Sequence, residues 1–233
     1  MDARDGRLYS RTPPARLQTQ WPPGLHPLAG GCLLLVPEPG EPEELLVFFH
    51  GASGRAADGL ALMESLVSAR GLLVLLPSSR RGTWDMVQGR TGPDVEMLDA
   101  GLAQVMAAYD VRRVALAGFS DGGTYALSLG VANGDLVEQV LAFSPGFLAP
   151  LQPVGQPRVW VSHGTADAVL PVELCGRKVV AQLRASGYDV DYFEFEGGHV
   201  ITPNSSRPRS RPGSADERLQ EASLDAGRRF FGR

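Results

Sequence analysis

The sequence predicts a single α/β domain built on a mostly parallel central sheet with helices on both faces. Short apolar runs alternate along the chain with segments of helical pattern, as this architecture requires. Several of these runs are continuously apolar, which is typical of strands that are covered on both sides. The chain has 233 residues and is 43% hydrophobic, so it can bury one sizeable core, and two domains are not expected.

The order of the elements follows from the pattern along the chain. The strands are expected where leucine, valine and phenylalanine form short runs, at Cys32–Val36, Leu45–Phe49, Leu72–Leu76, Val114–Ala117, Val140–Phe143, Val159–Val161 and Val190–Phe195. Helices are expected in the longer segments between and after them, at Ala56–Ala69, Asp94–Tyr109, Gly122–Ala132, Val172–Ser186 and Glu217–Phe230. The sequence contains no internal repeats.

Two stretches break this alternation. Residues 1–30 are rich in proline and arginine and are expected to form an irregular arm, with an edge strand near Arg7–Tyr9. Residues 202–215 have the Ser, Arg and Pro composition of a flexible loop inserted into the domain that spans 31–233. This insertion either covers a functional site or is a disordered excursion, and its composition favours disorder.

Composition and charge exclude several classes of function. The net charge is −4 and the pI is about 5.6, whereas a surface that binds nucleic acid is usually strongly basic. The N-terminus has no apolar segment of signal-peptide length and no run could span a bilayer, so a cytoplasmic protein is expected. Cys32 and Cys175 have no C-x-x-C spacing and are expected to be free, buried thiols.

Residues 113–130 carry the most information about chemistry. They are an apolar strand, a Gly-x-Ser-x-Gly turn and a helix, in that order, which is the pattern of a nucleophile elbow. This tight turn would hold the Oγ of Ser120 clear of the backbone. Glycine is expected at positions 118 and 122 because a Cβ would collide across the turn. Ser120 is therefore the candidate nucleophile.

A nucleophilic serine needs a base, and the base needs an acid that fixes its tautomer. Asp167 follows the strand at Val159–Val161, and His199 follows the strand at Val190–Phe195. All three residues thus come just after the carboxyl end of a predicted strand, where open α/β sheets place their ligands. The sequence predicts a triad of Ser120, Asp167 and His199.

The motifs His50-Gly51-Ala52, Gly118-Phe-Ser-Asp-Gly-Gly123, His163-Gly-Thr-Ala-Asp167 and Gly197-Gly-His199 resemble those of a known family. They are similar to the serine esterases of the α/β-hydrolase fold, in the phospholipase/carboxylesterase group that also holds acyl-protein thioesterases. The resemblance spans about residues 31–203. It implies ester hydrolysis through an acyl-enzyme, with no cofactor. No metal site is expected, because none of the four histidines is spaced i, i+3 or i, i+4 from another ligand histidine. No inserted lid domain fits between the predicted strands, and a small-molecule ester is the expected substrate. Family members usually lack an insertion between the histidine and the last helix.

Ester hydrolysis builds negative charge on the carbonyl oxygen, so donors must stand where that charge forms. In this fold one donor is the backbone N–H after the nucleophile, here that of Asp121 at the start of a helix. By resemblance, the loop after Leu45–Phe49 supplies the other, from the N–H of Ala52.

The remaining histidines and acids have structural interpretations. His50 and His163 are expected to be hydrogen-bonded scaffold residues, with His163 bracing the loop that carries Asp167. His26 is expected to lie at the surface or to pack in the arm. Among the acids, Asp94 is expected to cap a helix. Asp85 could line the site, and Asp191 is a weaker candidate for the triad because it lies within a strand.

The resemblance places apolar residues around the substrate. The expected pocket residues are Trp84, Phe147, Leu148, Val169, Leu170 and Val200. The alternative is that they only seal the core. The predicted function is a serine carboxylesterase for small or medium acyl or aryl esters, acting as a monomer or homodimer. A thioesterase, a polyester-oligomer hydrolase or an acyltransferase would use the same triad, and an inactive binding module is the remaining alternative.

Overall fold

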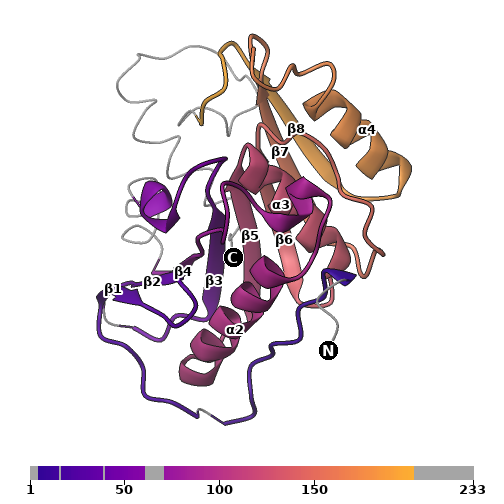
Figure 1. Cartoon of the computed structure of the whole chain (residues 1–233). Coiled ribbons are helices and arrows are strands. Elements are labelled where there is room, and N and C mark those ends of the chain that lie inside the picture. The colour runs from indigo at the N-terminus through magenta and orange to yellow at the C-terminus, as the bar shows by residue number, and fades with distance from the viewer. Residues whose placement is uncertain (1–4, 16, 39, 61–70, 202–233) are drawn as a thin grey trace, which may run out of the picture.

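The computed structural model describes residues 5–15, 17–38, 40–60 and 71–201 (Figure 1). Its centre is an eight-stranded sheet in the order β1-β2-β4-β3-β5-β6-β7-β8. The six strands from β4 to β8 in this order are parallel, whereas β1 and β2 run antiparallel to their neighbours. The bounds are β1 Gly24–Pro27, β2 Leu33–Val36, β3 Glu44–Phe49, β4 Leu73–Leu76, β5 Arg113–Phe119, β6 Val137–Phe143, β7 Arg158–Gly164 and β8 Val190–Phe195.

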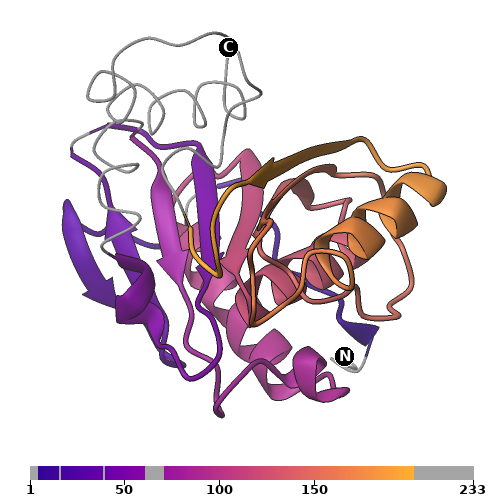
Figure 2. The same ribbon diagram turned by 90° about the horizontal axis from the view of Figure 1, so that it is seen from above.

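The larger core lies on the face of the sheet that carries the described helices (Figure 1 and Figure 2). These helices are α2 (Pro93–Ala108), α3 (Asp121–Ala132) and α4 (Gly176–Ala185), and a 3-10 turn, η2, spans Asp85–Gln88. In α3 every residue from 122 to 132 is buried, so this helix is central. A smaller cluster on the other face packs against the helical residues 56–60. The predicted α/β fold class is therefore confirmed.

The seven predicted strands are all present, with ends shifted by a few residues at most. The helix predicted over Val172–Ser186 begins only at Gly176, because the preceding residues form turns after Pro171. Asp94 lies inside α2 and makes no side-chain cap of that helix, contrary to prediction. The parts of the chain at 61–70 and 202–233, which include the predicted insertion and last helix, lie outside the described residues.

The N-terminal arm differs from the prediction in one element. No strand forms at Arg7–Tyr9, since the backbone N–H groups of Leu8 and Tyr9 bind side chains, at Asn133 and Asp99. The edge strand is instead β1, which pairs with β2. Its Gly-Leu-His-Pro sequence lacks the strand pattern that could have predicted it.

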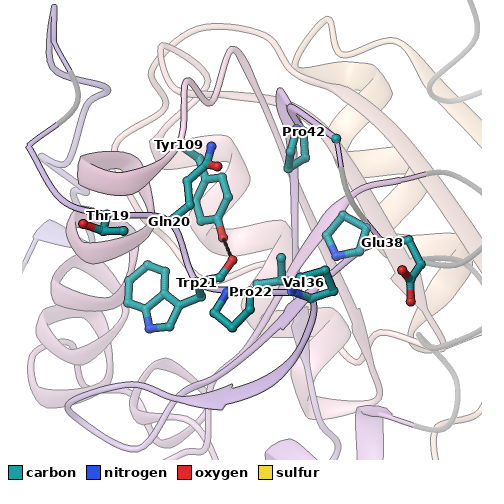
Figure 3. A pocket seen from close by; sticks show the side chains of 11 residues that line it. Thr19, Gln20, Trp21, Pro22, Val36, Glu38, Pro42 and Tyr109 are labelled. Atoms are coloured by element: carbon teal, nitrogen blue, oxygen red, sulfur yellow. Dashed lines mark hydrogen bonds between the residues drawn. The ribbon is translucent and has the colours of Figure 1, made fainter.

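A pocket of about 520 Å³ lies where this arm meets the amino-terminal end of β3 (Figure 3). The ring of Trp21 stacks on that of Tyr109 with centroids 6.3 Å apart, and the Tyr109 hydroxyl donates to the Trp21 carbonyl. Pro42, which precedes β3, forms another wall. Ser120 follows the carboxyl end of β5, which is parallel to β3. This pocket and the candidate triad therefore lie at opposite ends of the parallel strands.

Candidate active site

The nucleophile elbow forms where β5 passes into α3. Ser120 has φ 57° and ψ −120°, a backbone conformation that residues other than glycine rarely adopt. A Cβ at Gly118 would lie 2.2 Å from the carbonyl oxygen of Gly122, which is the predicted collision across the turn. At Gly122, however, a Cβ would lie 2.1 Å from the carbonyl oxygen of Phe49 at the end of β3. The second glycine is thus required by the neighbouring strand rather than by the turn.

The structure brings the three predicted triad residues together at the carboxyl ends of β5, β7 and β8. The Oγ of Ser120 lies 2.9 Å from Nε2 of His199, and Nδ1 of His199 lies 2.7 Å from Oδ2 of Asp167. An ionised carboxylate can only accept, so Nδ1 carries the proton and Nε2 accepts from the serine hydroxyl. The Phe119 ring packs against the imidazole of His199, with centroids 4.7 Å apart.

Asp167 is held ionised by its surroundings. Burial opposes its charge, but hydrogen bonds from His199 and from the backbone N–H groups of Leu170 and Val169 outweigh this and lower the pKa of Asp167 below its usual value. Its Oδ1 accepts from Val169 N at 2.9 Å and from Leu170 N at 2.8 Å. His163, as predicted, braces this loop, because its Nε2 donates to the Leu170 carbonyl at 2.7 Å.

Two backbone N–H groups flank the serine where the sequence places an oxyanion hole. Asp121 is the first residue of α3, and Ala52 lies in the loop after β3. This loop approaches closely, since a Cβ at Gly51 would lie 3.5 Å from the Cβ of Ser120. Among the described residues, no hydrogen-bond acceptor is found for the N–H of Ala52 or Asp121. Both donors can therefore serve an oxyanion.

His50 fixes the loop that carries Ala52. Its Nδ1 donates to the Gly51 carbonyl at 2.7 Å, and its Nε2 accepts from the N–H of Ser79 at 3.0 Å. Burial lowers the pKa of His50, which favours the neutral ring that these two bonds require. Sequence reasoning predicted a scaffold role for His50 but missed its partner Ser79, which no motif marks.

Trp84 is not a wall of the substrate pocket, contrary to prediction. Its side chain is fully buried, and its indole N–H donates to the carbonyl of His50 at 2.9 Å. The ring packs between Phe49 and Tyr125 in the core. Trp84 therefore supports the loop that begins at His50 from the side of the core.

The other predicted pocket residues divide into two groups. Phe147, Val169 and Val200 are exposed, as residues that meet a substrate can be. Leu170 is partly buried, and Leu148 packs against the main core, as its alternative interpretation expected.

A small pocket that the sequence did not reveal adjoins the candidate oxyanion loop. It has a volume of about 220 Å³. The rings of Phe48 and Phe119 form its apolar walls, and its further lining is His50, Gly51, Ala52, Gly54, Asp58 and Gly59. Phe119 directly precedes the nucleophile, which is the one signal in the sequence that could have indicated it.

The alternative acids are occupied elsewhere. Asp85 and Asp94 are both buried and bind each other's backbone, with Asp85 N donating to Asp94 and Asp94 N donating to Asp85. Asp191 is exposed on β8, with an oxygen 3.8 Å from Arg158. Asp167 is the carboxylate that contacts His199. In the described part of the chain, no group of three His, Cys, Asp or Glu side chains could hold a metal ion.

Cys32 and Cys175 are both buried and free, as predicted, and burial raises the pKa of each thiol. His26 lies in β1, and its ring bonds to the Pro22 carbonyl. No helix in the residues that the structure describes is long and apolar enough to cross a membrane.

Comparison with solved structures identifies the fold. The chain superposes on the esterase PE8 with a TM-score of 0.64 at 20% identity, covering 87% of this chain and 97% of that one. A Thermogutta terrifontis esterase gives 0.61 at 17% identity, covering 93% and 96%. Acyl-protein thioesterase 2 of Zea mays gives 0.56 at 18% identity, covering 84% and 99%. No protein-family model and no curated protein matches this chain. The chain has the α/β-hydrolase fold.

Proposed function

We propose that this chain is a serine carboxylesterase that hydrolyses small or medium acyl or aryl esters through an acyl-enzyme. The observation that carries the proposal is the continuous hydrogen-bonded line from Ser120 through His199 to Asp167 on a strained elbow. The esterases and the thioesterase that share its fold are consistent with this chemistry.

In the proposed cycle, Nε2 of His199 takes the proton of Ser120 as its Oγ attacks the ester carbonyl. The N–H groups of Ala52 and Asp121 hold the oxyanion, and Asp167 stabilises the imidazolium. His199 then gives its proton to the alcohol as the bond to the acyl carbon breaks. Water repeats these steps on the acyl-enzyme and releases the acid.

The size of the pocket beside Ala52 supports the proposed substrate class. A space of about 220 Å³ between Phe48 and Phe119 is of a size that holds a short acyl or a single aryl group. The exposed side chains of Phe147, Val169 and Val200 leave room for a longer group on the other half of the substrate.

The first test is labelling with a fluorophosphonate followed by intact mass measurement. The proposal expects a single adduct on the wild type and none on Ser120→Ala. Absence of an adduct on wild type would identify an inactive binding module. A panel of p-nitrophenyl esters and matched thioesters of graded length then measures the substrate class, and kcat/KM is expected to fall steeply for long acyl chains. A preference for thioesters would replace the carboxylesterase by a thioesterase with the same triad.

A further inference from the structure

His163 is a buried histidine beside the triad that the proposed cycle does not use. It lies in β7 with no exposed surface. Its Nε2 lies 2.7 Å from the Leu170 carbonyl and 3.3 Å from Oδ2 of Asp167. That oxygen is the one that also accepts from Nδ1 of His199 at 2.7 Å. Two histidines therefore approach the same carboxylate oxygen.

The polar contacts of the His163 ring are all made at Nε2. Its Nδ1 is buried and has no hydrogen-bond partner among the described residues. The backbone at Gly176 closes this side of the ring, because a Cβ there would lie 2.6 Å from Nδ1. Because Nε2 faces a carbonyl and a carboxylate, both of which can only accept, this nitrogen carries a proton.

This one N–H donates to the loop that carries Asp167, and the carboxylate oxygen Oδ2 lies 3.3 Å from the same nitrogen. The carboxylate's Oδ1 holds the N–H groups of Val169 and Leu170, and His163 holds the carbonyl of Leu170. The backbone of Leu170 is thus held at both its N–H and its carbonyl, and the carboxylate cannot rotate without breaking its bonds to Val169 and Leu170. Its Oδ2 remains directed at His199.

We propose that His163 is a positioning residue for the triad, whose Nε2–H orients Asp167 and shares the charge of its Oδ2 with His199. This inference rests on the proposed esterase function. Of the charged or titratable groups in the described part of the chain, Glu194 is the register partner of His163 on β8, and Cys175 directly precedes Gly176, whose backbone meets the ring. Glu194 is already paired with Arg177 of α4.

Three substitutions at His163 distinguish the effect of the N–H donor from the effect of the volume of the ring. His163→Gln can place an amide N–H where Nε2 lies, whereas the shorter His163→Asn places it near the position of Nδ1. His163→Leu fills the space with no donor. We expect kcat to fall about 10- to 100-fold in His163→Leu and His163→Asn, because the acid loses its alignment. His163→Gln should stay within about 3-fold of wild type, because it keeps the donor.

A second measurement distinguishes positioning from a purely structural role. Without a donor from position 163, Oδ2 attracts the proton of His199 more strongly. The midpoint of the acidic limb of the kcat/KM profile should therefore move to higher pH in His163→Leu and return in His163→Gln. The NMR signal of the proton between His199 and Asp167 should shift in the same order.

Equal activity in all three variants and wild type would overturn the inference. So would an equal loss in all three with lower thermal stability and an unmoved pH midpoint, since that pattern indicates packing alone. Fluorophosphonate labelling of wild type is measured first. If wild type takes up no label, the proposed function itself fails, whereas an active wild type with the outcomes above disproves only the role of His163.

Discussion

At the scale of single residues, Ser120 and His199 are expected to act as a unit, because the proton that His199 accepts in the first step comes from Ser120. Ser120→Ala and His199→Ala should each lower kcat by roughly 10⁴-fold or more, and the double variant should be scarcely slower than either. Steady-state kinetics on one p-nitrophenyl ester measure all three. Losses that multiply would mean that the two residues act independently.

Asp167 offers a prediction with a matched control. Asp167→Asn should lower kcat by up to about 10⁴-fold, because an amide no longer stabilises the imidazolium or fixes its tautomer. Asp191→Asn changes the same group on an exposed strand position and should leave kcat near wild type. Circular dichroism checks that both variants fold. A loss of activity in Asp191→Asn with a normal Asp167→Asn would make the acid assignment wrong.

At the scale of elements, the sequence predicted those parts whose signal is local. The strands were found because continuous apolar runs such as Leu73–Leu76 are buried on both faces. The elbow was found because its glycines and serine stand at fixed spacing. The strand β1 was missed because its pairing depends on a neighbour rather than on its own residues. Trp84 was misassigned because only the fold shows that its N–H meets the His50 carbonyl.

The loop that carries Ala52 should respond to pH through His50. Since the pKa of His50 is lowered in the folded protein, its neutral form contributes stability that is present above the unfolded value of about 6.5. This stability is lost as the pH falls through the lowered folded pKa, because protonation removes the acceptor of the Ser79 N–H. His50→Gln should be less stable at pH 8 and should lack this part of the decline.

Urea unfolding between pH 8 and pH 5 measures the effect as the difference between wild type and His50→Gln. Substitution of His26, whose ring bonds to the Pro22 carbonyl in the arm, is the matched control for removal of a histidine outside this loop. A constant difference between wild type and His50→Gln at all pH values would show that His50 does not titrate with folding.

At the scale of the whole molecule, the sequence predicted the fold and the site, but it did not predict how the N-terminal arm is attached to the domain. The predicted arm is tied across the domain by residues far away in the sequence. The side-chain oxygen of Asn133 accepts from Leu8 N at 2.7 Å, and its amide donates to the carbonyls of Gly6 and Leu129 at 2.8 Å. Asn133 and Leu8 are fully buried, although neither position belongs to a recognisable motif.

These hydrogen bonds predict that Asn133, which directly follows the last residue of α3, holds the arm to the domain. Asn133→Ala leaves a buried N–H and two carbonyls without their partner, so the free energy of unfolding should fall by about 3 kcal/mol or more. Arg11→Ala removes an exposed ion pair with Asp135 and local bonds to the carbonyls of Leu8 and Ser10, and should cost less, about 1 kcal/mol. Urea unfolding measures both. Fluorophosphonate labelling of folded Asn133→Ala should remain complete, because the arm lies away from the carboxyl ends of the strands. An equal cost of the two substitutions would show that the arm is held by its surface charges instead.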